Sequence, residues 1–161
     1  MSNIVVSDWL YDIVRDASGV PPTLIKNPID ESVFYPDPGV EHHPNEVAVL
    51  YNTREHKGFA DLYQALQIVR DAVPDLVVNA FGAPGRPDWS PEWIHYTSNA
   101  DQTQLRTIYN RSAVYAGATV TEGFGLTYAA SIVCGCAPVA TPFQGTRVLP
   151  DEKCAMPPPV P

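Results

Sequence analysis

Several features are missing from this sequence, and each absence narrows the class of protein. No apolar run approaches the ~20 residues that a helix needs to span a bilayer, and residues 1–7 lack the basic start and long apolar core of a secretory signal. Only 3 cysteines are present, and Cys134 and Cys136 are too close together for a usual zinc pair. We therefore expect no transmembrane segment, reduced thiols and a cytoplasmic protein.

Basic residues are also scarce. The chain carries 10 Lys and Arg against 18 Asp and Glu, for a formal net charge of -8. This balance argues against nucleic acid or an anionic membrane as a partner, although a local basic pocket for a small anion stays open. A length of 161 residues with 45% hydrophobic content suits one domain with a single core.

Apolar runs and helical repeats alternate along the chain. Residues that recur at helical spacing, such as Phe59, Leu62 and Leu66, predict helices, and continuous apolar runs predict buried strands. Ser7 is expected to cap the first helix with its side chain, and the polar residues 36–45 predict a loop. The expected strands are 23–25, 47–51, 76–81, 93–96, 113–119, 137–141 and a last extended piece at 154–156, and the expected helices are 8–16, 59–73, one opening at Asp101, and 127–134.

This alternation is typical of right-handed βαβ units. We therefore expect an α/β fold with a Rossmann-like, doubly wound parallel sheet. In such sheets ligands bind at the carboxyl ends of the strands. Residues 52–58, 82–86, 121–126 and 142–145 form four glycine-bearing loops that are expected at this edge, and they favour a site of nucleotide type.

Residues 120–127 predict a strand, a tight turn and the start of a helix. Gly123 and Gly125 flank Phe124, and glycines let the backbone turn sharply and approach a ligand closely. The N–H groups at the start of the next helix would then face the turn and form an anion site. Glu122 is placed to accept hydrogen bonds from hydroxyls beside the anion, and a phosphate beside hydroxyls suggests a sugar nucleotide.

The same turn, followed by a short helix and the run Cys-Gly-Cys-Ala-Pro-Val-Ala, resembles the donor-binding half of group 1 glycosyltransferases of the GT-B fold. In that family the motif is Glu-x7-Glu, in which the second Glu holds the ribose hydroxyls. Glu122 matches the first position, but Ala130 occupies the second. Loss of such a carboxylate implies roughly tenfold to hundredfold weaker nucleotide binding, unless Tyr128 or Ser131 substitutes.

The resemblance also implies roles for individual residues. Arg54 and Lys57 resemble a basic pair that binds the donor diphosphate by charge-assisted hydrogen bonds, although the arginine in the family usually lies further from the lysine. The alternative is a solvated loop in which opposite charges at 54–57 pair locally. The implied set is Glu122 as the catalytic contact to the donor sugar, then Arg54, Lys57, Gly123, Phe124, Gly125 and Leu126 at the diphosphate, and Gly82 and Thr127 as possible nucleotide contacts.

The resemblance covers one of the family's two domains. Residues 1–35 resemble the crossover segment between the domains with a first helix, and residues 36–161 resemble the nucleotide-sugar-binding domain. The implied activity is retaining glycosyl transfer from a nucleoside-diphosphate sugar, with no cofactor and no metal ion. Because the acceptor half is missing from this segment, we expect no turnover in isolation.

Two other functions stay open. The chain could be a degenerate, non-catalytic half that docks to a partner chain supplying the missing domain, an alternative that Ala130 and the missing first domain favour. A flavodoxin-like nucleotide binder unrelated to sugars is a weaker alternative. Trp89 and Trp93 flank a proline-rich loop; packing is the favoured interpretation of both, and stacking on a base or a sugar is the alternative.

Overall fold

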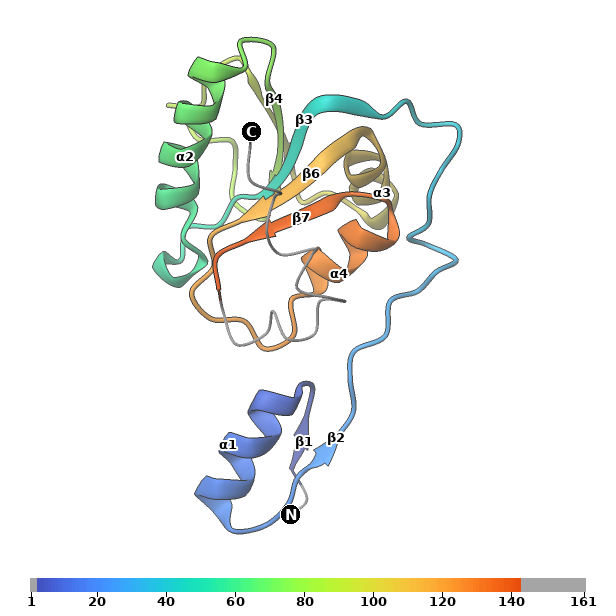
Figure 1. Ribbon diagram of the computed structural model, residues 1–161, viewed down its shortest axis with the longest axis vertical. Helices are drawn as coiled ribbons and strands as arrows, with labels where there is room; N and C mark the ends of the chain where they lie inside the picture. Colours follow the sequence, from blue (N-terminus) through green and yellow to red (C-terminus); the bar gives the residue numbers. More distant parts are fainter. Residues whose placement is uncertain (1–2, 143–161) are drawn as a thin grey trace, which may run out of the picture.

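The fold is an α/β arrangement built on a parallel sheet (Figure 1). The computed structural model describes residues 3–142. The expected extended piece at 154–156 and most of the expected loop at 142–145 lie outside these residues. The elements are β1 (Ile4–Val5), α1 (Asp8–Ser18), β2 (Thr23–Leu24), β3 (His43–Leu50), η1 (Glu55–Lys57), α2 (Phe59–Ala72), β4 (Val77–Gly82), β5 (Ile94–Ser98), α3 (Gln102–Arg111), β6 (Ser112–Gly117), α4 (Leu126–Val133) and β7 (Ala137–Ala140).

Five parallel strands form the main sheet in the order β5-β4-β3-β6-β7. Helix α2 covers one face, and α3 and α4 cover the other (Figure 1). Each face has its own apolar core, one containing Val49, Leu62 and Val78 and the other containing Tyr109, Tyr115 and Tyr128. The expected α/β class with a doubly wound parallel sheet is therefore confirmed. None of the helices within residues 3–142 has the length and apolar character needed to cross a bilayer.

Strand β3 begins earlier than the sequence predicts. The expected loop over residues 36–45 is wrong at its end, because the strand already starts at His43. His43 pairs with Ser112 of β6, and the register shifts before Val47 pairs with Val114. Polar composition predicts a loop here, but the pairing partner lies far along the chain and overrides that local signal.

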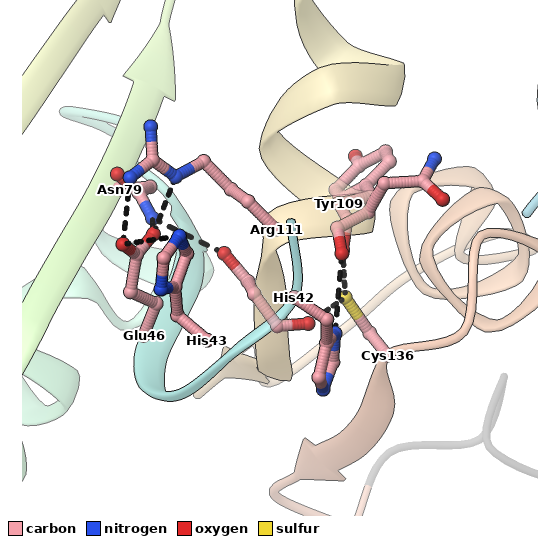
Figure 2. Close-up of polar contacts among 9 residues, drawn as sticks. His42, His43, Glu46, Asn79, Tyr109, Arg111 and Cys136 are labelled. Atoms are coloured by element: carbon pink, nitrogen blue, oxygen red, sulfur yellow. Dashed lines mark hydrogen bonds and ion pairs between the residues drawn. The ribbon is translucent and has the colours of Figure 1, made fainter. Parts of the chain in front are cut away.

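Glu46 holds this irregular part of β3 to its neighbours (Figure 2). Arg111 donates to both carboxylate oxygens, at 2.6 and 2.7 Å, and Asn79 Nδ2 donates to Oε2 at 2.6 Å. The Glu46 side chain is only 8% exposed. Burial raises the pKa of Glu46, but the hydrogen bonds and charge of Arg111 together with the Asn79 bond outweigh it, so the pKa lies below its ordinary value.

Helix α1 with β1 and β2 forms a small unit at the N-terminal end of the described chain (Figure 1). Ser7 stands at the N-cap of α1, but its side chain makes no cap hydrogen bond, so the expected side-chain cap is wrong. The hydroxyl is instead fully buried in the packing and has no hydrogen-bond partner among the described residues. The helix ends at Gly19 in the left-handed conformation, as the sequence predicts.

We expect Glu46→Gln to lower the free energy of unfolding by about 1–3 kcal/mol at neutral pH, because a neutral amide replaces a charged acceptor. The Arg111 side chain is 37% exposed and can bind water when its partner is lost, so we expect a loss near the lower end of this range. Because the folded-state pKa of Glu46 is lowered, its contribution is present above the unfolded pKa of about 4.3 and is lost as the pH falls through the folded-state pKa.

Urea unfolding followed by circular dichroism, stepped from neutral to acidic pH, measures this difference. The gap between wild type and variant should close on acidification. Glu92→Gln, at an exposed glutamate, is the matched control and should leave the free energy of unfolding unchanged. Equal free energies of unfolding of wild type and Glu46→Gln at neutral pH would show that the charge of Glu46 does not stabilise the fold.

Candidate functional site

The strand order places two loops side by side at the carboxyl edge of the sheet. From the central strand β3 the chain adds β4 and β5 on one side and then returns to add β6 and β7 on the other. The loops that follow β3 and β6 therefore leave the sheet next to each other. Such a reversal in strand order opens a crevice, which is where α/β sheets bind ligands.

A glycine allows these two loops to touch. A Cβ atom on Gly58 would lie 1.9 Å from the carbonyl oxygen of Ala118, and the φ angle of Gly58 is +64°. No other residue fits this position without moving the backbone. The carbonyl of His56 also accepts a hydrogen bond from the backbone N–H of Val120 at 2.9 Å. The close approach brings Lys57 against the segment that carries Glu122.

Lys57 and Glu122 form an ion pair across the crevice. Lys57 Nζ donates to Glu122 Oε1 at 2.5 Å, and the two side chains are 17% and 19% exposed. The space beside the pair is about 10 Å³, enough for one water molecule. The structure therefore brings together two residues that the sequence analysis assigns to a donor, but each has the other as its partner.

The start of α4 lies beside this pair. Gly125 precedes the helix with a φ angle of +86°, a conformation that favours glycine. The backbone N–H of Ala129 bonds to the carbonyl of Gly125 at 3.1 Å. Within residues 3–142, no residue accepts a hydrogen bond from the backbone N–H groups of 123–127. These amides, which include the expected contacts at Gly123 and Leu126, can therefore bind an anion.

Two buried tyrosines, Tyr115 and Tyr128, line the crevice beside the ion pair. The rings of Tyr115 and Tyr128 meet edge to face with centroids 4.8 Å apart, and both are almost fully buried. Burial raises the pKa of each phenol well above its ordinary value, so both stay neutral. Buried aromatic side chains lower the local dielectric, which strengthens the interaction between charged groups beside them.

A second cavity, of about 320 Å³, adjoins the first turn of α4. Ala130 and Thr127 line it from that helix, Gln102 and Leu105 line it from α3, and Ile29 lines it from the extended segment before β3. The sequence analysis did not identify Gln102 or Leu105, because neither belongs to a recognisable motif.

Neither suggested substitute for a carboxylate at position 130 lines this cavity. Ser131 is fully buried and donates to the Tyr128 carbonyl at 2.8 Å, so its hydroxyl already has a partner. Tyr128 packs on the other side against Gly117. Neither side chain therefore adjoins the cavity that Ala130 lines, and the suggestion that one of them replaces the missing ribose contact stays a prediction.

The remaining expected contacts lie apart from the Lys57–Glu122 pair. Arg54 is exposed and lines a different cavity, with Tyr51 and Trp89. Gly82 ends β4 and is buried, and a Cβ atom there would lie 2.2 Å from the carbonyl oxygen of Tyr51. Tight packing accounts for this glycine, so its role as a nucleotide contact stays a prediction.

The described residues offer no cluster for a metal ion, since no group of three or more His, Cys, Asp or Glu side chains within 3–142 is placed to hold one. Burial raises the pKa of Cys134 to about 11 and that of Cys136 to about 12, so both stay protonated and unreactive. Cys136 Sγ donates to the Tyr109 carbonyl at 3.0 Å (Figure 2). These two cysteines belong to the core.

We expect Lys57 and Glu122 to be energetically coupled. A double-mutant cycle with Lys57→Met and Glu122→Gln should give a coupling energy of about 1–2 kcal/mol, between the values for exposed and for buried pairs. The exposed pair of Lys26 and Asp8, at 2.9 Å, is the matched control and should give a smaller coupling energy. Additive effects in the Lys57–Glu122 cycle, measured by urea unfolding, would contradict a stabilising pair.

The chain resembles part of a known enzyme in sequence. No protein-family model matches the chain. A phosphatidyl-myo-inositol mannosyltransferase from Propionibacterium freudenreichii subsp. shermanii is 30% identical over 160 residues, an alignment that covers 93% of this chain and 41% of the relative. The chain thus spans about two fifths of the length of this curated relative.

Solved structures share the fold at lower identity. The pneumococcal O-GlcNAc transferase GtfA, in complex with UDP and GlcNAc, matches with a TM-score of 0.76 and 19% identity over 93% of this chain and 32% of that protein. A chain of the GtfA/B complex matches with a TM-score of 0.70 and 20% identity over 94% of this chain and 33% of that one. In sequence this chain is therefore similar to part of a mannosyltransferase, and in fold it is similar to one domain of GT-B glycosyltransferases.

Proposed function

We propose that the chain is the donor-binding half of a retaining glycosyltransferase and binds a nucleoside-diphosphate sugar at the carboxyl edge of β3 and β6. One observation carries the proposal. Lys57, Glu122 and the first turn of α4 meet in one crevice, although Lys57 and Glu122 lie 65 positions apart in sequence. A cation, a carboxylate and a helix N-terminus together match a diphosphate joined to a hydroxyl-bearing sugar.

Donor binding in this crevice requires an exchange of partners. The space of about 10 Å³ beside the ion pair is too small for a diphosphate, so we infer that Lys57 moves away from Glu122 to reach a phosphate oxygen. The released carboxylate can then accept hydrogen bonds from sugar hydroxyls. Lys57 and the amides at the start of α4 would also stabilise the charge that develops on the leaving nucleoside diphosphate.

The cavity of about 320 Å³ suits the nucleoside. It shares Leu126 and Thr127 with the first turn of α4, so a nucleoside there would be joined directly to a diphosphate at that turn. Its volume lies within the range of small-molecule sites. The GtfA structure with the same fold holds UDP, which supports a nucleotide as the ligand. Ala130 in the wall offers no acceptor for ribose hydroxyls, although the Asp30 carboxylate also lines the cavity, so we infer weaker nucleotide binding than a carboxylate at position 130 would give.

A non-catalytic module that docks to a partner chain is the second candidate. Ala130 favours it, because the missing carboxylate lowers the expected affinity for a donor. The N-terminal unit favours it too, since β1 and β2 form a sheet of two short strands and no residue of α1 is buried. Ile4 and Ile13 are exposed on this unit, and a second domain or chain would cover them.

Calorimetric titration with uridine, guanosine and adenosine diphosphate sugars tests the proposal. We expect saturable binding of one of them, weakened at least tenfold by Lys57→Ala because a charge-assisted contact to phosphate is lost. Lys26→Ala removes the same charge from the N-terminal unit and should leave the affinity unchanged. No binding of any donor would favour the interaction module.

Restoring a carboxylate at position 130 provides a separate test. We expect Ala130→Glu to tighten binding of the preferred nucleoside diphosphate about tenfold, because a charged acceptor then faces the ribose hydroxyls. The Ala130→Gln variant introduces a side chain of the same size without the charge, and its affinity for the nucleotide should rise less. The gain should vanish with the 2′,3′-dideoxy analogue of the same nucleotide; an equal gain with that analogue would place the ribose elsewhere.

A further inference from the structure

A cavity of about 600 Å³ lies apart from the Lys57–Glu122 crevice, between α2 and the loop that joins β4 to β5. Tyr51, Phe59, Tyr63 and Trp89 line it with aromatic rings. The loop after β3 contributes to both sites, but neither Lys57 nor Glu122 reaches this cavity. The proposed donor site therefore leaves it without a function.

The aromatic wall of this cavity presents one ring to solvent. Trp89 is 51% exposed, although its ring packs against Tyr63 with centroids 4.8 Å apart and against Phe59 at 6.1 Å. Tyr51 meets Phe59 edge to face at 4.7 Å and supports the same group. The three rings hold Trp89 in place, so it offers a flat apolar surface that loses little conformational freedom when a ligand binds.

The rim of the cavity is polar and carries little positive charge. Asn52 and Gln64 supply amides, Glu55 and Asp61 supply carboxylates, and Arg54 supplies the only cation among the lining residues. Two carboxylates against one guanidinium leave the lining with a net negative charge. This balance repels a phosphate or a nucleotide, while the amides and carboxylates can bind hydroxyl groups.

We propose that this cavity binds a neutral pyranose unit of a glycan, stacked on Trp89. A pyranose ring has one face of C–H groups and a perimeter of hydroxyls, so it matches a flat aromatic surface surrounded by amides and carboxylates. A nucleobase would also stack, but its phosphates would meet the negative rim. The inference uses residues other than those of the donor site and does not depend on it.

Titration of the 161-residue chain with maltotriose, mannotriose and cellotriose, followed by calorimetry, tests the inference. We expect at least one trisaccharide to bind with a Kd of about 1 mM or below. Trp89→Ala should weaken that binding at least tenfold, and Gln64→Ala, on the exposed rim, should weaken it several-fold. Ile68→Ala removes an exposed apolar side chain from the same helix outside the cavity and should change nothing.

Further comparisons separate this site from the proposed donor site. Lys57→Ala should leave trisaccharide binding intact, and uridine diphosphate should not compete with it. Circular dichroism establishes whether each variant is folded. If the Trp89→Ala variant does not fold, the effect of Gln64→Ala on trisaccharide binding tests the inference in its place. No binding of any of the three trisaccharides, or binding that depends on Lys57 and not on Trp89 or Gln64, would overturn the inference.

Discussion

The contact between the loops after β3 and β6 is the constraint on which the candidate site depends. Gly58 lies so close to the Ala118 carbonyl that no side chain fits between them, and this approach sets Lys57 against Glu122. The strand order makes the two loops neighbours, and the glycine lets them meet. The ion pair lies beside buried tyrosines, where a low dielectric makes each charge depend strongly on having a partner.

The pair would also explain how an acidic chain binds the proposed diphosphate. With a formal net charge of -8, the protein has little long-range attraction for a diphosphate, so recognition must come from local groups. In the proposed exchange Lys57 is never left without an anionic partner, because a phosphate takes the place of Glu122. The cost of separating the pair would then select ligands that offer both a phosphate for the cation and hydroxyls for the carboxylate.

Local patterns predicted most of the elements, and long-range contacts account for the errors. Phe59, Leu62 and Leu66 marked α2 correctly because helical periodicity depends only on neighbours. The start of β3 at His43 was missed because it depends on pairing with Ser112, far along the chain. The buried side chain of Ser7 was missed because its packing outweighs capping. The motifs assigned Lys57 and Glu122 to one site, and the structure places the two side chains together, but nothing in the sequence indicates that they pair.

The central claim is that Glu122 and a phosphate compete for Lys57. The most direct test is to measure how tightly the Glu122→Gln variant binds a nucleoside diphosphate that carries no sugar. If Glu122 competes with phosphate for Lys57, removing its charge should tighten binding of the diphosphate several-fold relative to wild type, since no partner must be displaced. Calorimetry with folded protein at equal ionic strength would measure the change. Unchanged or weaker binding by Glu122→Gln would contradict the exchange of partners at Lys57.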